Sequence, residues 1–417
     1  LFSNEYGIRS GDRIALFMKN CTEYLEVLYA IWWLGAIAVP INSKLHPKEA
    51  AWIIENAETK LLFTNDGALS KATSLWSGCT EISIDSSTFQ ESRRGGQGLT
   101  IPQTVDSSAL AWLFYTSGTT GRPKGVMLSH GNLIVMSTTY TLDVDDVSSE
   151  DAVLYAAPIS HGAGLYNFVH VRRAARHVIP PSRGFDPKEV LDLAEEIGNV
   201  SFFAAPTMVK RLVEEASNSK RTGRGIKSVI YGGGPMYTTD IKFALDVMGP
   251  RFIQIYGQGE VPMTITSLRR EVIADRGAPR WSQRLASVGT AQSCVEIRVV
   301  DDSLHDLPAG TPGEIIVRSP AVMKGYWKNE HATSETIVDG WLKTGDVGHF
   351  DQDGFLTLTD RSKDVVISGG TNIYPREVEE VISQHPAVSE VAVIGQPNPE
   401  WGEEVVAFVV PLAGASC

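Results

Sequence analysis

The sequence predicts an α/β fold, and three features of the chain point to that class. Short apolar runs typical of buried strands alternate with segments whose apolar residues recur at helical spacing. Two of the predicted strands end in glycine-rich turns, where open α/β sheets bind their ligands. From about residue 287 the pattern becomes β-rich and hairpin-like. With 417 residues the chain exceeds one ordinary domain, so two or three domains are expected.

The first third of the chain shows the βαβ rhythm of a parallel sheet covered by helices. Strands are expected at three apolar runs, Arg13–Met18, Ala36–Ile41 and Lys60–Thr64. Helices are expected between them, at Cys21–Leu34 and His46–Ala57. Residues 87–106 are polar and rich in Gly and Ser, which predicts a loop.

The stretch Tyr115–Gly125, with the sequence YTSGTTGRPKG, is predicted to bind polyphosphate. Its glycines let backbone N–H groups turn toward an anion, its hydroxyls add donors, and Lys124 adds a positive charge. Pro123 stands where a Walker A loop requires glycine, so that loop is excluded. Strands are expected on both sides, at Leu110–Tyr115 and Gly125–Ser129, so no helix N-terminus assists. A solvated hairpin loop is the alternative.

The middle of the chain repeats the alternation of strands and helices. Two helices are expected, at Asp186–Ile197 and Pro206–Ser217, and three strands, at Val200–Ala204, Lys227–Tyr231 and Arg251–Tyr256. The last two strands run into the glycine turns Gly232–Pro235 and Gly257–Glu260. Both turns are therefore expected at the carboxyl edge of one sheet, where a ligand would lie.

The C-terminal part is expected to contain short strands, tight turns and one helix. Strands at Val295–Asp301 and Gly313–Arg318 precede a turn at Asp351–Gly354. The last elements are a helix at Pro375–His385 and strands at Asp364–Ser368, Val391–Ile394 and Glu404–Pro411. The pattern predicts a large N-terminal domain of parallel and mixed sheets over 1–360, with a β-rich subdomain at about 287–359, and a small α+β C-terminal domain over 361–417.

Composition excludes several classes of function. The net charge is −12, from 37 basic and 49 acidic residues, which argues against nucleic acid or an anionic membrane as the main partner. The cysteines Cys21, Cys79, Cys294 and Cys417 are scattered, which indicates neither disulfides nor zinc and fits a reducing, cytoplasmic compartment. The longest apolar run, Tyr29–Ile41, is shorter than the ~20 residues that span a bilayer.

Several residues near predicted strand ends could carry chemistry. Glu260 suits a Mg²⁺ ligand or a surface carboxylate, and Tyr256 suits a base-stacking platform or a core aromatic. Asp346 suits ribose hydroxyls or a turn cap, and Arg361 suits a ribose, a phosphate or a surface ion pair. His161 lies among small residues, as in a pocket wall, although a lone histidine is more often structural. Motifs of serine hydrolases, zinc proteases and dinucleotide-binding enzymes are absent.

Taken in order, these motifs resemble those of the AMP-forming acyl-CoA synthetases and related adenylating enzymes, which include peptide-synthetase adenylation domains and luciferase. The resemblance covers essentially the whole chain. It rests on Tyr115–Gly125, His161, Gly232–Pro235, Tyr256–Glu260, Gly313–Ile315, Trp341–Asp346, Asp360–Asp364 and Ser368–Gly370.

The resemblance implies a role for each motif residue. The phosphates of ATP would be held by Thr116, Ser117, Gly118, Thr119, Thr120, Gly121 and Lys124. Adenine and ribose would be surrounded by Gly232, Gly233, Gly234, Tyr256, Gly257, Gln258, Asp346 and Arg361. Catalysis would fall to Lys124, Glu260 and His161, with Glu260 as the Mg²⁺ ligand and His161 at the carboxylate pocket. Lys363 would be a hinge, and Gly369 and Gly370 would face CoA.

The implied reactants are ATP with Mg²⁺, CoA and a small carboxylic acid. The carboxylate would attack the α-phosphorus of ATP, giving acyl-AMP and pyrophosphate, and the CoA thiol would attack the acyl-AMP after the small domain rotates. Since this chemistry depends mainly on positioning and charge neutralisation, it needs no covalent nucleophile on the enzyme. A homodimer is left open.

Two departures from the family pattern bear on these expectations. Gly259 stands where the family's Tyr-Gly-x-Thr-Glu usually carries threonine, which removes one hydroxyl from the site. The family also continues beyond the position of Cys417 with a lysine that contacts the acyl carboxylate. The sequence is therefore expected to be either a piece of a longer protein or a truncated form, and weak adenylation is expected if the truncation is real.

The acid is expected to be a medium-chain fatty acid or an aryl acid. His161, Phe202 and Phe203, together with the glycine turns, suggest a roomy apolar pocket without an arginine for a second carboxylate. Two alternatives remain open at this point. The acceptor could be a carrier-protein thiol, or the chain could be a non-catalytic homologue that binds ATP or acyl-AMP.

Overall fold

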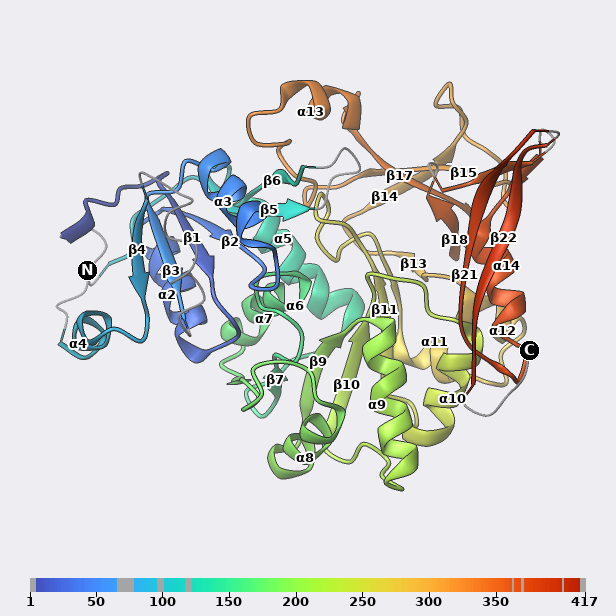
Figure 1. Cartoon of the computed structure of the whole chain (residues 1–417), viewed down its shortest axis with the longest axis horizontal. Coiled ribbons are helices and arrows are strands. Elements are labelled where there is room, and N and C mark those ends of the chain that lie inside the picture. Colours follow the sequence, from blue (N-terminus) through green and yellow to red (C-terminus); the bar gives the residue numbers. More distant parts are fainter. Residues whose placement is uncertain are drawn as a thin grey trace.

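The computed structural model describes residues 5–65, 79–95, 101–116, 122–361, 364–368, 371–399 and 401–412. Two helix-covered sheets form the N-terminal part, a third, antiparallel sheet follows them, and a fourth sheet with one helix lies at the C-terminal end (Figure 1). This arrangement confirms the predicted α/β class with its β-rich C-terminal region.

The first sheet has the strand order β4-β3-β1-β2-β5-β6. Its strands are β1 (Arg13–Phe17), β2 (Ile37–Pro40), β3 (Leu61–Thr64), β4 (Thr80–Ser83), β5 (Leu110–Thr116) and β6 (Lys124–Ser129). All pairs are parallel except β5 with β6, which confirms the two strands predicted on either side of the Tyr115–Gly125 motif. Helices α2 (Thr22–Trp33) and α3 (Pro47–Asn56) match the expected ones.

One expectation for this region is wrong, because Ser87–Gly95 forms helix α4 within the segment predicted as a loop. The backbone N–H of Phe89 donates to the Ser86 hydroxyl, which caps the first turn. Phe89 itself is buried, with its ring centroid 6.0 Å from that of Phe63. The tertiary contact of a single aromatic residue thus stabilises a helix in an otherwise polar sequence.

The second sheet has the order β13-β12-β11-β10-β9-β7-β8, and its strands are β7 (Ala152–Leu154), β8 (Arg176–Val178), β9 (Val200–Ala204), β10 (Ile226–Tyr231), β11 (Phe252–Tyr256), β12 (Thr266–Leu268) and β13 (Thr290–Ala291). The strands from β8 to β11 are parallel. The helices associated with this part are α5 (His130–Thr139), the π-helix η2 (Tyr140–Val144), α6 (Gly162–Leu165), α7 (Asn167–Arg172), α8 (Pro187–Ile197), α9 (Pro206–Asn218), α10 (Thr238–Met248), α11 (Arg270–Ala274) and α12 (Trp281–Ala286).

The third sheet is antiparallel and contains β14 (Glu296–Val300), β15 (Gly313–Arg318), β16 (Ile337–Val338), β17 (Trp341–Phe350) and β18 (Leu356–Arg361), with α13 (Glu330–Thr336) beside it. The fourth contains β19 (Val366–Ser368), β20 (Thr371–Ile373), β21 (Val388–Asn398) and β22 (Gly402–Pro411). Helix α14 (Pro375–Ile382) packs on β21 and also reaches β18. Among the described residues, no helix combines the length and apolar character needed to cross a bilayer.

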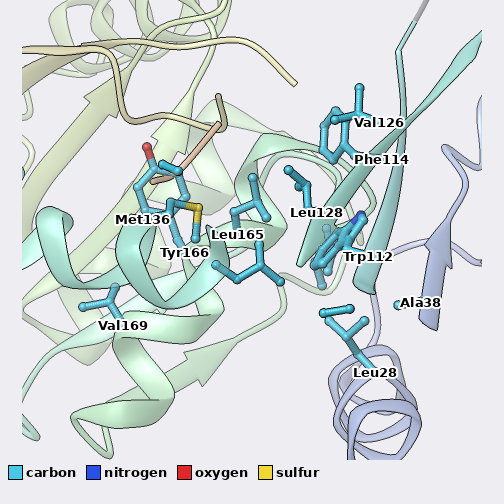
Figure 2. Close-up of a cluster of buried hydrophobic side chains, with 14 of the residues drawn as sticks. Leu28, Ala38, Trp112, Phe114, Val126, Leu128, Met136, Leu165, Tyr166 and Val169 are labelled. Atoms are coloured by element: carbon cyan, nitrogen blue, oxygen red, sulfur yellow. The ribbon is translucent and has the colours of Figure 1, made fainter. Parts of the chain in front are cut away.

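The largest hydrophobic core joins the first two sheets. It takes Trp112 from β5 and Ile230 from β10, together with side chains of α5, α6 and α7. Figure 2 shows Leu128 of β6 within this core, with Met136 of α5 and Leu165 of α6. Because both sheets bury apolar surface in one core, their loops are held in a defined relation to each other.

A buried asparagine adds a polar connection between the same two sheets. Asn20 follows β1, and its side-chain amide donates to the carbonyl oxygens of Tyr155 and Ala157, both at 2.9 Å. Its Oδ1 accepts from the backbone N–H of Ile159, also at 2.9 Å. One side chain therefore satisfies three polar groups of the segment that leads to His161.

We predict that Asn20→Ala lowers the free energy of unfolding by about 3 kcal/mol, because it leaves buried backbone groups without partners. Urea unfolding of the two proteins measures the difference. Asn42→Ala is the matched control, since its Oδ1 accepts one bond within an exposed turn. Equal losses in the free energy of unfolding for the two substitutions would contradict the predicted stabilisation by the Asn20 hydrogen bonds.

We also predict a stability loss at acid pH that is traceable to His170. This side chain is buried, and burial lowers its pKa from 6.5 to about 4. Because the folded pKa is depressed, the unfolded chain takes up the proton first as the pH falls. The stability contribution is therefore complete above pH 6.5, and about 3 kcal/mol is lost as the pH falls toward 4.

Thermal unfolding between pH 7 and pH 4 tests this prediction through the slope of the midpoint against pH. His170→Phe should flatten that slope relative to the parent chain. His331→Phe, which replaces an exposed histidine, should leave the slope unchanged. A His170→Phe slope as steep as that of the parent chain would refute the assignment.

Candidate active site

A cavity of about 730 Å³ lies where the carboxyl ends of β10 and β11 meet β17, β18 and the C-terminal unit, which consists of the fourth sheet and α14. The glycine turn Gly233–Pro235 and the end of β11 form one wall. Arg376 and Glu379 of α14, with residues of β21 and β22, form another. Part of each predicted glycine turn, Gly233–Pro235 and Gly257–Gln258, thus lies at a ligand-sized cavity at the carboxyl ends of the strands, as expected for this fold class.

Asp346 is the centre of a hydrogen-bond cluster at this cavity. It is buried on β17, and its Oδ2 accepts from the Tyr256 hydroxyl at 2.6 Å and from the Gln258 side-chain amide at 2.7 Å. Gln258 also donates to the carbonyl oxygen of Thr344 at 2.9 Å. Three residues predicted to surround adenine and ribose are therefore brought together, although Asp346 and Tyr256 lie 90 positions apart in sequence.

The backbone places a fourth predicted residue near this cluster. Arg361 ends β18 and pairs with Asp346 of β17 in the antiparallel register. Its side chain lies outside the described residues, as do Lys363, Gly369 and Gly370 and the loop residues Ser117, Gly118, Thr119, Thr120 and Gly121.

The glycines of the turn after β10 are required by the backbone conformation and by close packing. Gly233 has a φ of +78°, a conformation that residues with a Cβ rarely adopt. Gly233, Gly234 and Gly257 line the cavity, whereas Gly232 packs against Ile255. A Cβ at Gly232 would approach the carbonyl oxygen of Ile255 to 2.5 Å.

Lys124 and Glu260 meet at a residue that the sequence analysis missed, Tyr326. The Lys124 ammonium lies 4.9 Å from the centroid of the Tyr326 ring. The Tyr326 hydroxyl donates to Glu260 Oε1 at 2.6 Å. Burial raises the pKa of Tyr326 well above its ordinary value, so the hydroxyl keeps its proton. The sequence signal for this residue is weak, because an aromatic after a glycine in a loop has no periodicity.

His161 and Gly259 both lie close to side chains at the end of β5. The His161 ring centroid lies 5.0 Å from that of Phe114, and desolvation by the surrounding protein lowers the histidine pKa even though part of its surface is exposed. A Cβ on Gly259 would lie 2.5 Å from Thr116 Cγ2 and 3.1 Å from Phe114 Cδ1. Because Gly259 has no side chain, the backbone of the turn after β11 can pack directly on β5.

Of the two phenylalanines predicted to line an acyl pocket, the structure places only one on the site side. Phe203 stacks on Tyr166 at 5.7 Å between centroids and lies about 4.0 Å from a Cβ built on Gly233. Phe202 is instead buried in the core on the other face of the sheet, so that expectation is wrong. Side chains of neighbouring residues in a strand point to opposite faces, which rules out a shared pocket.

The C-terminal unit is joined to the second sheet's helices by polar contacts. The Tyr237 hydroxyl donates to Glu379 Oε2 at 3.2 Å, and the Lys210 ammonium donates to the carbonyl oxygen of Ser389 at 2.6 Å. Arg376 is the second residue of α14, lines the cavity and donates its backbone N–H to Asp360 at 3.3 Å. Sequence reasoning missed Arg376 as a cationic residue at the cavity.

Comparison with known proteins identifies matches over nearly the whole chain. A model of AMP-binding enzymes matches residues 2–327, and a model of the AMP-binding enzyme C-terminal domain matches residues 377–416. Feruloyl-CoA synthase of an Amycolatopsis species is 33% identical over 409 residues, which cover 98% of this chain and 80% of that protein.

A second relative and a solved structure agree with this match. The fatty acid–[acyl-carrier-protein] ligase ScoC of Streptomyces coeruleorubidus is 31% identical over 413 residues, covering 98% of this chain and 78% of that protein. The crystal structure of ATP-bound MatB from Rhodopseudomonas palustris aligns with a TM-score of 0.88 at 30% identity, covering 100% of this chain and 81% of that one.

We predict that Gly259→Thr destabilises the protein by about 2 kcal/mol, because the new Cβ would overlap Thr116 Cγ2. Thr116→Ser removes that methyl group, so the double variant should recover at least half of the loss. Thermal unfolding of the two single variants and the double variant forms the cycle. Gly184→Thr serves as control, since the nearest atom to its Cβ lies at 3.9 Å. Additive effects at positions 259 and 116 would contradict the proposed overlap.

Proposed function

The chain belongs to the AMP-binding enzyme family as an AMP-forming CoA ligase, and we propose that it activates a fatty or aryl carboxylic acid with ATP before transferring the acyl group to CoA. The observation that carries the proposal is the convergence of Tyr256, Gln258 and Asp346 at one cavity. Lys124 and Glu260 lie at neighbouring strand ends, joined through Tyr326.

Adenosine would occupy the cavity beside the glycine turn. Gly233 and Gly234 leave room for a planar base there, and the Tyr256 ring lines the same wall. Two donors orient the Asp346 carboxylate, which would accept hydrogen bonds from vicinal ribose hydroxyls. Arg361 would contribute a further contact to ribose or phosphate from the paired strand.

The donor set near Glu260 fits Mg²⁺ bound together with ATP. Among the described residues, no group of three potential metal ligands exists. Mg²⁺ commonly binds through one or two carboxylates plus substrate phosphates, and Glu260 supplies one carboxylate. When bound, the ion would neutralise phosphate charge, and Lys124 would hold a phosphate oxygen.

The reacting carboxylate would lie between the phosphate end of the site and His161. The lowered pKa keeps the His161 imidazole neutral near pH 7, so it can donate one hydrogen bond without adding charge. Phe203 and Tyr166 would bound an apolar acyl pocket beyond it. The aryl acid named for the feruloyl-CoA synthase relative is consistent with such a pocket.

In the proposed first step, a carboxylate oxygen bonds to the α-phosphorus and the bond to the pyrophosphate leaving group breaks. In the second, the CoA thiolate bonds to the acyl carbon and AMP leaves. We propose domains at 1–360, with its β-rich part at about 287–359, and 361–417, with Lys363 as the hinge between them and Gly369 and Gly370 at the CoA path. Arg376 and Glu379 already bring the second unit to the cavity.

A carrier-protein thiol is the second candidate acceptor, because the ScoC relative is a ligase for an acyl-carrier protein. ATP-dependent pyrophosphate release, screened over fatty, aryl and dicarboxylic acids, tests the activation step. AMP release with CoA against an acyl-carrier protein then distinguishes the acceptors. Nucleotide binding without pyrophosphate release for any acid would favour the non-catalytic alternative instead.

We predict that Lys124→Met lowers the rate of acid-dependent pyrophosphate exchange about 100-fold, because a positive charge at the phosphates is lost. Exchange of labelled pyrophosphate into ATP measures the effect. Lys328→Met removes a nearby lysine that pairs with Glu58 and should keep at least half of the parent rate. Equal rates for both variants would exclude Lys124 from the phosphate site.

A further inference from the structure

We infer that Tyr326 is a positioning residue that holds Lys124 and Glu260 apart, so that the lysine stays available to phosphate and the carboxylate to a divalent cation. The inference rests on the proposed function, because it assigns both charged residues to the ATP site. It concerns how this chain prevents those two residues from neutralising each other.

The position of Tyr326 between the two charges is the first argument. Its ring faces the Lys124 ammonium at 4.9 Å, and its hydroxyl donates to Glu260 Oε1 at 2.6 Å. Within the described residues Lys124 and Glu260 form no ion pair with each other. A neutral side chain thus contacts both charged groups, one through its ring and one through its hydroxyl, without cancelling the charge of either.

The second argument is that the backbone around Tyr326 is attached to both of its partners. Residues 324–327 pair with β6, the strand that begins at Lys124, through Met127 N–H to the Gly325 oxygen at 2.9 Å and Trp327 N–H to the Gly125 oxygen at 2.7 Å. Met323 N–H donates to the backbone oxygen of Glu260 at 2.8 Å. The same segment therefore fixes the distance between the strand of Lys124 and the turn of Glu260.

Further contacts fix Tyr326 itself. Its backbone N–H donates to the Thr333 hydroxyl at 2.9 Å, and the side chain is 7% exposed. Asn132, near the start of α5, donates to the carbonyl oxygens of Pro320 and Val322 at 2.7 and 2.9 Å. Because its segment is held at both ends, Tyr326 has little freedom to move toward Lys124 or Glu260.

The carboxylate geometry indicates what the tyrosine leaves open. The hydroxyl engages Oε1, and no hydrogen bond to Oε2 is found among the described residues. A partner outside the metal's immediate ligands that orients a carboxylate in this way typically changes metal affinity by about 10–100-fold when removed. The hydroxyl and the ring therefore have separable roles, one toward the cation and one toward the lysine.

Two substitutions separate these roles. Tyr326→Phe removes only the hydroxyl and should weaken Mn²⁺ binding in the complex with α,β-methylene-ATP about tenfold, while metal-free binding of the analogue stays within about twofold. Tyr326→Leu also removes the ring and should weaken metal-free analogue binding about threefold as well. Electron paramagnetic resonance of free Mn²⁺ and calorimetry in EDTA measure the two affinities. Neither readout requires turnover.

Tyr29→Phe is the matched control, because it removes a hydroxyl that donates to the Asn167 side chain at 2.9 Å, away from this cluster. Unchanged Mn²⁺ affinity in Tyr326→Phe would overturn the inference, even if Tyr326→Leu fails to fold. If the parent chain itself binds no Mn²⁺ with the analogue, the proposed function fails and the inference falls with it. A tenfold loss in Tyr326→Phe alone, with Tyr29→Phe unaffected, would support the inference.

Discussion

The common core of the first two sheets is the constraint on which the site depends. Trp112 and Ile230 come from different sheets, and helices α5 to α7 complete the core that both share. Asn20 adds a polar connection at the same junction through three hydrogen bonds to the segment before His161. Since packed cores do not deform gradually, the strand ends of the two sheets are held at fixed positions. The phosphate motif and the glycine turns can then form one site.

The second feature of the site is its local electrostatics, since an acidic protein is proposed to bind an anionic ligand there. The chain carries a net charge of −12, so Arg376, the cationic residue among the described residues that line the cavity, must act locally. Tyrosine hydroxyls engage two of the carboxylates that are proposed to bind ligand, Tyr256 at Asp346 and Tyr326 at Glu260. These neutral donors orient the carboxylates without cancelling their charge, which leaves them able to bind ribose hydroxyls or a cation.

Much of the fold was predictable from local patterns. Helix α8 illustrates this, because Asp186 caps it, Pro187 occupies its first turn and its apolar residues recur at helical spacing. Strand β9 was predicted with its observed bounds for a similar reason, as a short β-branched and aromatic run. Helix α4 was missed because its stability comes from Phe89 packing on Phe63, a contact between segments distant in sequence.

The sequence by itself determined the α/β class, the two strands that flank the Tyr115–Gly125 motif and the family to which the chain belongs, because local periodicity and ordered motifs encode them. Only the tertiary structure decided which side chains meet. It brought Gln258 to Asp346, placed Tyr326 between Lys124 and Glu260, and sent Phe202 into the core while Phe203 faced the site. Such contacts join residues far apart in the chain and depend on sheet register and strand facing, which no local pattern specifies.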